Sequence, residues 1–302
     1  MSRKGNKIDG WIIIDKDPGM TSTDVVRAIK RIFHPLKTGH AGTLDPLATG
    51  ILPIALGEAT KTIPYIVDAK KEYDFTIRWG EQRTTDDSEG EVVKSSDKRP
   101  SARDIKAALP SFIGEIEQMP PQFSALKVGG KRAYDLARSG QTVELKPRMV
   151  TVDVFDLIGD GGDENHGNFH VVCGKGTYIR SLARDLGQKL QCFGHITAIR
   201  RTRVGPFSEA CVISLAKLND LSHSARALEA LIPVMTALDD IPALAITEDE
   251  ARRIKNGQTL RLPTKRSGTV RLTLDKALIA LASVNQGETR PLRVFNLNST
   301  PN

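Results

Sequence analysis

In the segment 71–79, apolar and polar side chains alternate from Tyr73 onward. The apolar members are Tyr73, Phe75, Ile77 and Trp79, and the polar members between them are Asp74, Thr76 and Arg78. Because successive side chains of a strand point to opposite faces, this period of two predicts a half-buried β-strand. The chain must therefore build a sheet in which this strand has one covered face and one polar face.

Other segments carry signals for helices and strands. A short apolar strand is expected at 11–15, and the hydroxyl residues at 21–23 are N-cap candidates for a helix. Another strand is expected at 169–173, before a helix over 179–190 with apolar residues on one face. Two capping boxes predict further helix starts, one at Ser101 and Asp104 and one at Thr247 and Glu250.

Three segments interrupt these elements. Residues 82–99 are rich in Asp, Ser, Thr and Glu, which predicts an exposed loop with a short strand near 91–93. Residues 127–148 combine a glycine pair with basic side chains and are expected to leave the main sheet. Residues 231–240 lose periodicity and are a candidate linker. The short alternating strands after it predict a small, basic, mostly β domain.

The chain of 302 residues has 43 basic and 36 acidic side chains, a formal charge of +7 and a pI near 9.3. Residues 241–302 contain ten basic and five acidic residues, so this last fifth carries +5 of the +7. Such an uneven distribution suits contact with a polyanion, because cations that neutralise phosphates release counterions. A merely solubilising surface explains the charge equally well.

Composition also narrows the class of protein and the compartment. A hydrophobic fraction of 39% and a charged fraction of 26% are typical of a soluble globular protein, and no stretch has the length of a membrane span. The apolar run at 11–14 is too short for a signal peptide, so we expect the cytoplasm. The cysteines lack the spacing of a zinc site or a disulfide framework.

The segment 37–61 combines glycine, proline and polar residues at high density. Asp45 lies in its middle, fixed by Pro46 and followed by apolar residues. A carboxylate at the mouth of an apolar pocket can act as a nucleophile or a base, because few water molecules compete for it. A turn closed by an Asx hydrogen bond is the alternative explanation. The glycines that allow sharp turns or close approach to a ligand are Gly39, Gly42 and Gly50.

The segment 39–52, Gly-His-Ala-Gly-Thr-Leu-Asp-Pro-Leu-Ala-Thr-Gly-Ile-Leu, resembles the catalytic motif of the bacterial tRNA pseudouridine-55 synthases, the TruB family. The resemblance extends to 127–140, 176–182 and 199–203 and so covers most of the first 235 residues. The basic C-terminal part resembles, more loosely, the PUA-type RNA-binding domain of that family.

The resemblance implies an α+β pseudouridine-synthase fold with a mixed, largely antiparallel central sheet flanked by helices. The catalytic domain would span 1–235, with an RNA-contacting insertion at about 124–150. A small β-rich, PUA-like domain would span 241–302. One departure from the family pattern is the order Asp15-Lys16-Asp17-Pro18, in which proline stands one place later than usual after the lysine.

The resemblance also assigns roles to single residues. Asp45 would be the catalytic aspartate, and Arg180 would orient its carboxylate and keep it ionised. Tyr73 would stack on the flipped uracil, and His40 would take the place that the base leaves. Further expected substrate contacts are Tyr178 and Ile199 at the uracil pocket, Lys61 and Lys16 as RNA contacts or supports of the site, and Arg200 and Arg201 as phosphate contacts.

The implied reaction breaks the N1–C1′ bond of uridine 55 in the tRNA T loop, rotates the uracil and rejoins it through C5. The uridine must first leave its stack. The chemistry requires no cofactor and no metal, and the sequence contains no glycine-lysine motif for phosphate binding. Two roles stay open for Asp45, attack on C1′ or removal of the 2′ proton.

Three alternative functions stay open as well. The first is an RNA-binding protein without catalysis, and the second is a synthase guided by a separate RNA and partner proteins. The third is a glycosylase that releases the free base. The combination of Asp45, Tyr73 and Arg180 favours catalysis over binding alone. The segment 127–148 is typical of the stand-alone bacterial type, for which we expect a monomer that needs no protein partner.

Overall fold

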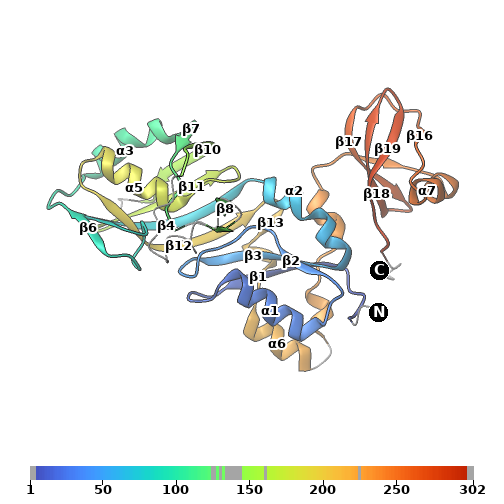
Figure 1. The fold of residues 1–302 in the computed structure, drawn as a ribbon, viewed down its shortest axis with the longest axis horizontal. Coiled ribbons are helices and arrows are strands. Elements are labelled where there is room, and N and C mark those ends of the chain that lie inside the picture. The colour runs from blue at the N-terminus through green and yellow to red at the C-terminus, as the bar shows by residue number, and fades with distance from the viewer. Residues whose placement is uncertain are drawn as a thin grey trace.

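The computed structural model of the chain describes residues 5–123, 127–128, 131–132, 145–159, 162–223 and 226–297. Its strands form two large sheets in separate lobes (Figure 1). The alternating segment forms β4 (Lys71–Trp79), as predicted. β4 lies inside the larger sheet between β12 (Gly194–Val204) and β11 (His166–Cys173).

The larger sheet has the strand order β14-β1-β3-β12-β4-β11-β10-β7, with β2 beside β3 and β13 beside β12. The pairs β1–β14 and β3–β12 are parallel, and the other pairs printed for this sheet are antiparallel. This arrangement confirms the expected mixed, largely antiparallel sheet. Its other strands are β1 (Gly10–Lys16), β2 (Thr38–His40), β3 (Thr49–Leu56), β7 (Gly114–Gln118), β10 (Arg148–Leu157), β13 (Phe207–Ser208) and β14 (Ile213–Ser214).

Helices begin where the sequence predicts caps. Thr21 and Asp24 form a capping box at the start of α1 (Ser22–Phe33), and Ser101 and Asp104 do the same for α3 (Ala102–Ala108). Within the described residues, no helix has the length and apolar character needed to cross a membrane. The other helices of this lobe are α2 (Ile63–Asp68), α5 (Ile179–Lys189) and α6 (Leu215–His223), with 3₁₀ turns η1 (Gly57–Thr62), η2 (Leu109–Phe112), η3 (Glu209–Cys211), η4 (Ala227–Ala230) and η5 (Val234–Leu238).

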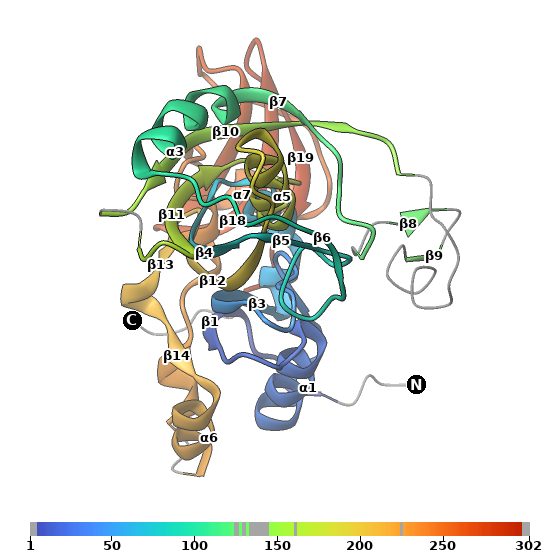
Figure 2. The ribbon, with the colours of Figure 1, turned by 90° about the vertical axis from the view of Figure 1, so that its left-hand side faces the viewer.

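Two short hairpins stand apart from the larger sheet. β5 (Glu81–Arg83) pairs with β6 (Val92–Ser95), and β8 (Lys127–Val128) pairs with β9 (Lys131–Arg132). Figure 2 shows the β5–β6 hairpin in front of the sheet. The β8–β9 hairpin belongs to the expected insertion at 124–150, most of which lies outside the described residues.

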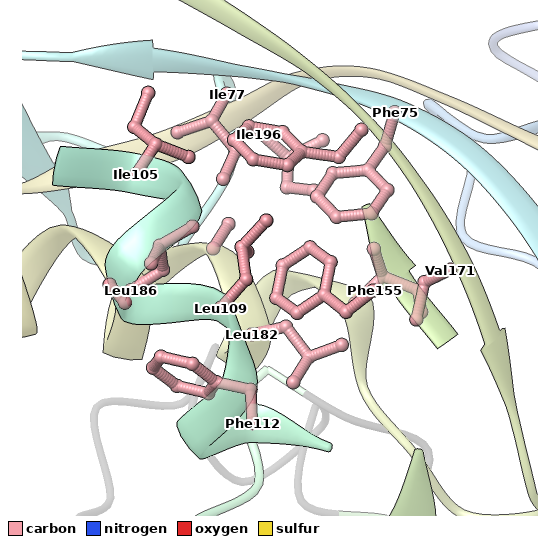
Figure 3. Close-up of a cluster of buried hydrophobic side chains, with 14 of the residues drawn as sticks. Phe75, Ile77, Ile105, Leu109, Phe112, Phe155, Val171, Leu182, Leu186 and Ile196 are labelled. Atoms are coloured by element: carbon pink, nitrogen blue, oxygen red, sulfur yellow. The ribbon is translucent and has the colours of Figure 1, made fainter. Parts of the chain in front are cut away.

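Apolar side chains fill both ends of the larger sheet. α3 and α5 cover the end with β4, β10 and β11, where the Phe75 and Phe169 rings stack with centroids 5.5 Å apart. Figure 3 shows Phe155 and Leu182 meeting in this cluster. α1 and α6 cover one face of β1 and β3 through a second cluster that contains Ile29. Because both clusters border β4 and β12, the middle of the sheet lies between two rigid supports.

The C-terminal lobe is a five-stranded sheet in the order β15-β17-β18-β19-β16. α7 (Glu248–Lys255) starts at the predicted capping box of Thr247 and Glu250. The lobe joins the rest of the chain through a shared apolar cluster that contains Trp11, Leu281 and Phe295. Its strands are β15 (Ala243–Ala245), β16 (Leu260–Arg261), β17 (Gly268–Leu274), β18 (Ala277–Asn285) and β19 (Glu288–Val294).

Candidate active site

The segment between β2 and β3 carries Asp45 and is held by hydrogen bonds from its surroundings. The Leu44 N–H donates to Ser22 Oγ at 2.9 Å, and the Ser22 hydroxyl donates back to the Leu44 carbonyl at 3.2 Å. The Pro46 carbonyl accepts from Gly19 N at 2.8 Å. The residues on both sides of Asp45 are thus held by the first residue of α1 and by the turn before it, so the backbone of Asp45 is fixed as well.

Lys16 lies under the same loop and is 1% exposed. Its Nζ donates to the carbonyl oxygens of Met20 at 2.8 Å and Pro46 at 3.1 Å, and also to that of Asp17 at 2.8 Å. Burial lowers the pKa of this ammonium to about 8, against the opposing effect of Asp17 and Asp45. Lys16 supports the loop through these bonds, in line with the second of its two expected roles, and a contact with RNA stays a prediction.

The Asp45 carboxylate is paired with Arg180 at the start of α5. Arg180 Nε lies 2.9 Å from Asp45 Oδ2, and the side chains are 6% and 44% exposed respectively. Arg180 Nη1 donates to the Thr85 carbonyl and Nη2 to the Phe123 carbonyl, each at 2.9 Å. Two carbonyls therefore fix the guanidinium, whereas the carboxylate it faces stays half-exposed.

A second carboxylate reaches the same guanidinium. Asp87 Oδ2 lies 3.4 Å from Arg180 Nη1, and both side chains are 6% exposed. Among the described residues, Arg180 Nε has no hydrogen-bond partner of regular geometry. Its contact with Asp45 is therefore an ion pair without a directional hydrogen bond.

A pocket of about 170 Å³ opens beside this pair. Four of its residues come from the segments around Asp45 and Arg180 and four from elsewhere, and together they are Asp45, Pro46, Leu47, Thr85, Asp87, Glu89, Phe123 and Arg180. The prediction that 82–99 is an exposed loop is wrong at Asp86 and Asp87, which are 5% and 4% exposed. Polar composition indicated exposure, but the arginines of α5 hold these carboxylates in the interior.

Tyr73 lies on β4 between the two apolar clusters and near Asp45. In the pairing of β4 with β12, Tyr73 lies opposite Arg201. Tyr73 and Ile199 both pack against the two apolar clusters. Burial raises the pKa of the phenol, while the Arg201 guanidinium beside it acts in the opposite direction. Tyr73 is half-buried and is not among the pocket-lining residues of the described chain.

Arg200 and Arg201 occupy opposite faces of β12. Arg201 is 1% exposed, and its guanidinium donates to the Ile51 carbonyl at 2.7 Å and to the Gly42 carbonyl at 3.2 Å. The predicted phosphate contact of Arg201 is therefore wrong, because this buried side chain binds the loop between β2 and β3 and the start of β3 from inside. Arg200 is partly exposed and pairs with Asp15 at 2.9 Å and with a second carboxylate, that of Glu209, at 2.7 Å.

Three other expected site residues, Tyr178, His40 and Ile199, lie outside the lining of the pocket in the described chain. Tyr178 caps α5, where Gln118 accepts from its N–H at 2.8 Å and donates to its carbonyl at 3.1 Å. His40 ends β2 and is half-buried, like Tyr178 and Ile199. None of the three is among the pocket-lining residues of the described chain. Gln118, which is 1% exposed, carried no signal in the sequence.

Lys61 lies at the junction between the lobes. Its Nζ pairs with Glu58 at 2.6 Å and donates to the Val294 carbonyl at 2.8 Å. Glu58 in turn accepts from Asn296 N at 2.7 Å. The structure therefore places Lys61 in the contact between η1 and the end of β19. In the part of the chain that is described, no group of three His, Cys, Asp or Glu side chains could hold a metal ion.

Comparison with protein families assigns this arrangement to a class. Residues 30–179 match the model of the TruB family pseudouridylate synthase (N terminal domain), and residues 180–241 match the tRNA pseudouridylate synthase B C-terminal domain. These two matches identify the chain, with its mixed sheet and its aspartate paired with a buried arginine, as a pseudouridine synthase.

Relatives narrow the class to one family. A tRNA pseudouridine synthase B of Nitrobacter winogradskyi is 52% identical over 305 residues, which cover 98% of this chain and 85% of the relative. One of Caulobacter vibrioides is 50% identical over 307 residues, with 98% of each chain covered. The chain belongs to the TruB family of pseudouridylate synthases.

Solved structures agree with this fold. An H/ACA ribonucleoprotein bound to a substrate RNA containing 2′-deoxyuridine includes a chain with TM-score 0.74 and 25% identity, covering 96% of this chain and 86% of that one. A Cbf5-Nop10-Gar1 complex gives TM-score 0.70 and 28% identity, covering 95% and 83%.

Proposed function

We propose that this chain is a tRNA pseudouridine synthase that isomerises uridine 55 of the T loop, with Asp45 as the catalytic carboxylate. The observation that carries the proposal is the Asp45–Arg180 pair, in which a buried guanidinium 2.9 Å away holds a carboxylate that is 44% exposed. The half-exposed carboxylate can reach a nucleoside from this position, and the arginine holds it beside the pocket. The relatives named tRNA pseudouridine synthase B support tRNA as the substrate.

The reaction begins when the target uridine leaves its stack and enters the pocket beside Asp45. Flipping costs on the order of a few kcal/mol, which contacts to the flipped base must offset. Tyr73 is proposed to stack on the uracil, and His40, Tyr178 and Ile199 to complete the site. Asp45 then attacks C1′ or removes the 2′ proton, and either role needs an ionised carboxylate near the sugar.

Arg180 serves this step through its fixed position. Its two Nη atoms donate to the Thr85 and Phe123 carbonyls at 2.9 Å, so the guanidinium keeps its place when Asp45 turns toward the sugar. A preorganised charge of this kind stabilises a changing charge distribution without reorganisation cost. Arg180 is accordingly proposed to orient Asp45 throughout bond cleavage, base rotation and reattachment.

The C-terminal lobe (241–302) is proposed to bind RNA as a PUA-like domain appended to the catalytic domain (1–235). Exposed cations on this lobe support the proposal, namely Arg252, Arg253, Lys255, Arg261, Lys265, Arg266, Lys276, Arg290 and Arg293. We further propose a monomer that needs no protein partner and works in the cytoplasm, where its tRNA substrate resides. Phosphate contacts would give the binding a strong dependence on salt.

Tritium release from RNA tests the proposed reaction. An unmodified tRNA transcript labelled at uracil C5 is incubated with the purified chain, and tritium in water is measured together with free uracil. We expect the wild-type transcript to release tritium into water without free uracil. A transcript in which cytidine replaces uridine 55 should release no tritium. Free uracil would indicate a glycosylase, and binding without tritium release would contradict the proposal. Release only after a guide RNA is added would indicate the guided type of synthase.

A further inference from the structure

The turn between β5 and β6 presents three consecutive residues to two arginines of α5. Thr85 offers its carbonyl to Arg180, and Asp87 places its carboxylate 3.4 Å from the same guanidinium. Asp86 lies between them, and its Oδ2 is 3.0 Å from Nη1 of Arg184. The Asp86 and Arg184 side chains are 7% and 12% exposed, so this second ion pair is also interior.

Arg184 repeats the arrangement of Arg180 one helical turn later. Its Nη2 donates to the Met119 carbonyl at 2.8 Å, and its Nε donates to Asp185 Oδ1 at 2.8 Å. Residues four apart share one face of a helix, so both guanidinium groups project toward the same surroundings. Both arginines therefore bind acceptors in the turn at 85–87 and one carbonyl each in the segment 119–123.

The backbone of Asp86 adopts a conformation that is uncommon outside glycine. Its φ is 61°, in the left-handed region, which costs most non-glycine residues about 1–2 kcal/mol and which Asp tolerates better than most. Hydrogen bonds fix it on both sides, since its N–H donates to the Arg83 carbonyl and its carbonyl accepts from Ile196 N–H, each at 3.1 Å. A strained residue with a buried charge persists where the surroundings demand that geometry.

Burial adds a second cost at this position. Desolvation raises the pKa of the Asp86 carboxyl to about 6, although Arg184 and Arg180 act in the opposite direction. A buried carboxylate lowers the stability of the fold unless a partner of opposite charge lies close to it in a well-formed ion pair. The ion pair with Arg184 thus offsets a cost that an uncharged residue here would avoid, which indicates that the charge has a purpose beyond stability.

We propose that Asp86 and Arg184 are positioning residues, whose ion pair fixes the turn at 85–87 so that Thr85 and Asp87 hold Arg180 and, through it, Asp45. The inference rests on the proposed function, because it assigns these residues to the geometry of the proposed catalytic carboxylate. Neither residue faces the pocket, so both act only through Arg180. Loss of the pair lets the turn relax away from α5 and leaves the Arg180 guanidinium with one fixed acceptor fewer.

Two substitutions at Asp86 test the proposal. Asp86→Asn keeps the shape of the side chain and removes its charge, whereas Asp86→Gly also relieves the left-handed backbone. Asp185→Asn is the matched control, since Asp185 pairs with the same arginine at 2.8 Å but belongs to α5 and is 31% exposed. Single-turnover tritium release and tRNA affinity are measured for each variant, at a temperature at which circular dichroism shows it folded.

We expect both Asp86 variants to release tritium on the order of tenfold more slowly or worse, since small misplacements of reacting groups cost up to a hundredfold. Their tRNA affinity should stay within about twofold of the parent, and Asp185→Asn should keep the parent rate. Parent rates in both Asp86 variants, or an equal loss in Asp185→Asn, would overturn the inference. So would a loss in Asp86→Asn that Asp86→Gly restores, because that pattern reports backbone strain alone.

These outcomes are separate from the fate of the proposed function. If the parent chain releases tritium and the Asp86 variants match it, the positioning role is refuted and the synthase activity stands. If the parent chain binds tRNA and releases none, the proposed function itself is refuted.

Discussion

Replacing Arg201 with methionine should destabilise the catalytic domain strongly without weakening RNA binding. The side chain is 1% exposed, and its guanidinium donates to the carbonyls of Ile51 and Gly42. Methionine retains the apolar stem but leaves both carbonyls without this donor. A hydrogen bond to a charged group contributes about 1.5–3 kcal/mol, so the two together predict a loss of roughly 3–6 kcal/mol.

Arg200→Met is the matched control, one residue earlier on the same strand. Its ion pairs with Asp15 and Glu209 are partly exposed, with 36% of the Arg200 side chain accessible, so we expect a loss of about 1 kcal/mol or less. Urea unfolding followed by circular dichroism gives both free energies. The account of Arg201 fails if the two variants lose equal stability, or if Arg201→Met reduces the salt dependence of tRNA binding as a lost phosphate contact would.

Three further perturbations follow from single contacts. Burial lowers the pKa of Lys16 to about 8 from 10.5, so the unfolded chain binds more protons between these values and the free energy of unfolding should rise with pH there. Lys16→Met should remove that rise, and an unchanged pH slope would contradict it. Lys61→Met removes the hydrogen bond from Lys61 to the Val294 carbonyl of the second lobe and should lower the free energy of unfolding by about 1 kcal/mol. Urea unfolding measures this loss, and an unchanged free energy would refute a stabilising contact. Replacing the exposed Arg261, Lys265 and Arg266 with glutamine should lower the slope of log affinity against log salt by up to about 3, and an unchanged slope would refute phosphate contact by this lobe.

Local patterns predicted much of the fold. The alternation at 71–79 gave β4 with its bounds, and the capping boxes located the starts of α3 and α7. These signals are local, because a cap or a period of two is complete within a few residues. The catalytic segment was also recognisable, since its glycines and Asp45 lie in one continuous stretch.

Partners far apart in the chain limited what could be predicted of the site. Asp87 meets Arg180, 93 positions later in the sequence, so a polar stretch that looked exposed became part of the interior. Arg200 and Arg201 are neighbours in the chain but point to opposite faces of β12, and only the strand pairing decides which one is buried. The contact of Lys61 with Val294 likewise depends on where the C-terminal lobe packs, and no local sequence signal predicts that position.

The most direct measurement of the central claim is single-turnover tritium release by Asp45→Asn beside Asp17→Asn. Both substitutions remove one carboxylate near the same loop, but only Asp45 faces Arg180, and Asp17 is exposed. If Asp45 is the catalytic carboxylate, Asp45→Asn binds tRNA with near-parent affinity and releases no tritium, while Asp17→Asn keeps the parent rate. Tritium release by Asp45→Asn at a rate comparable to the parent chain would contradict the assignment.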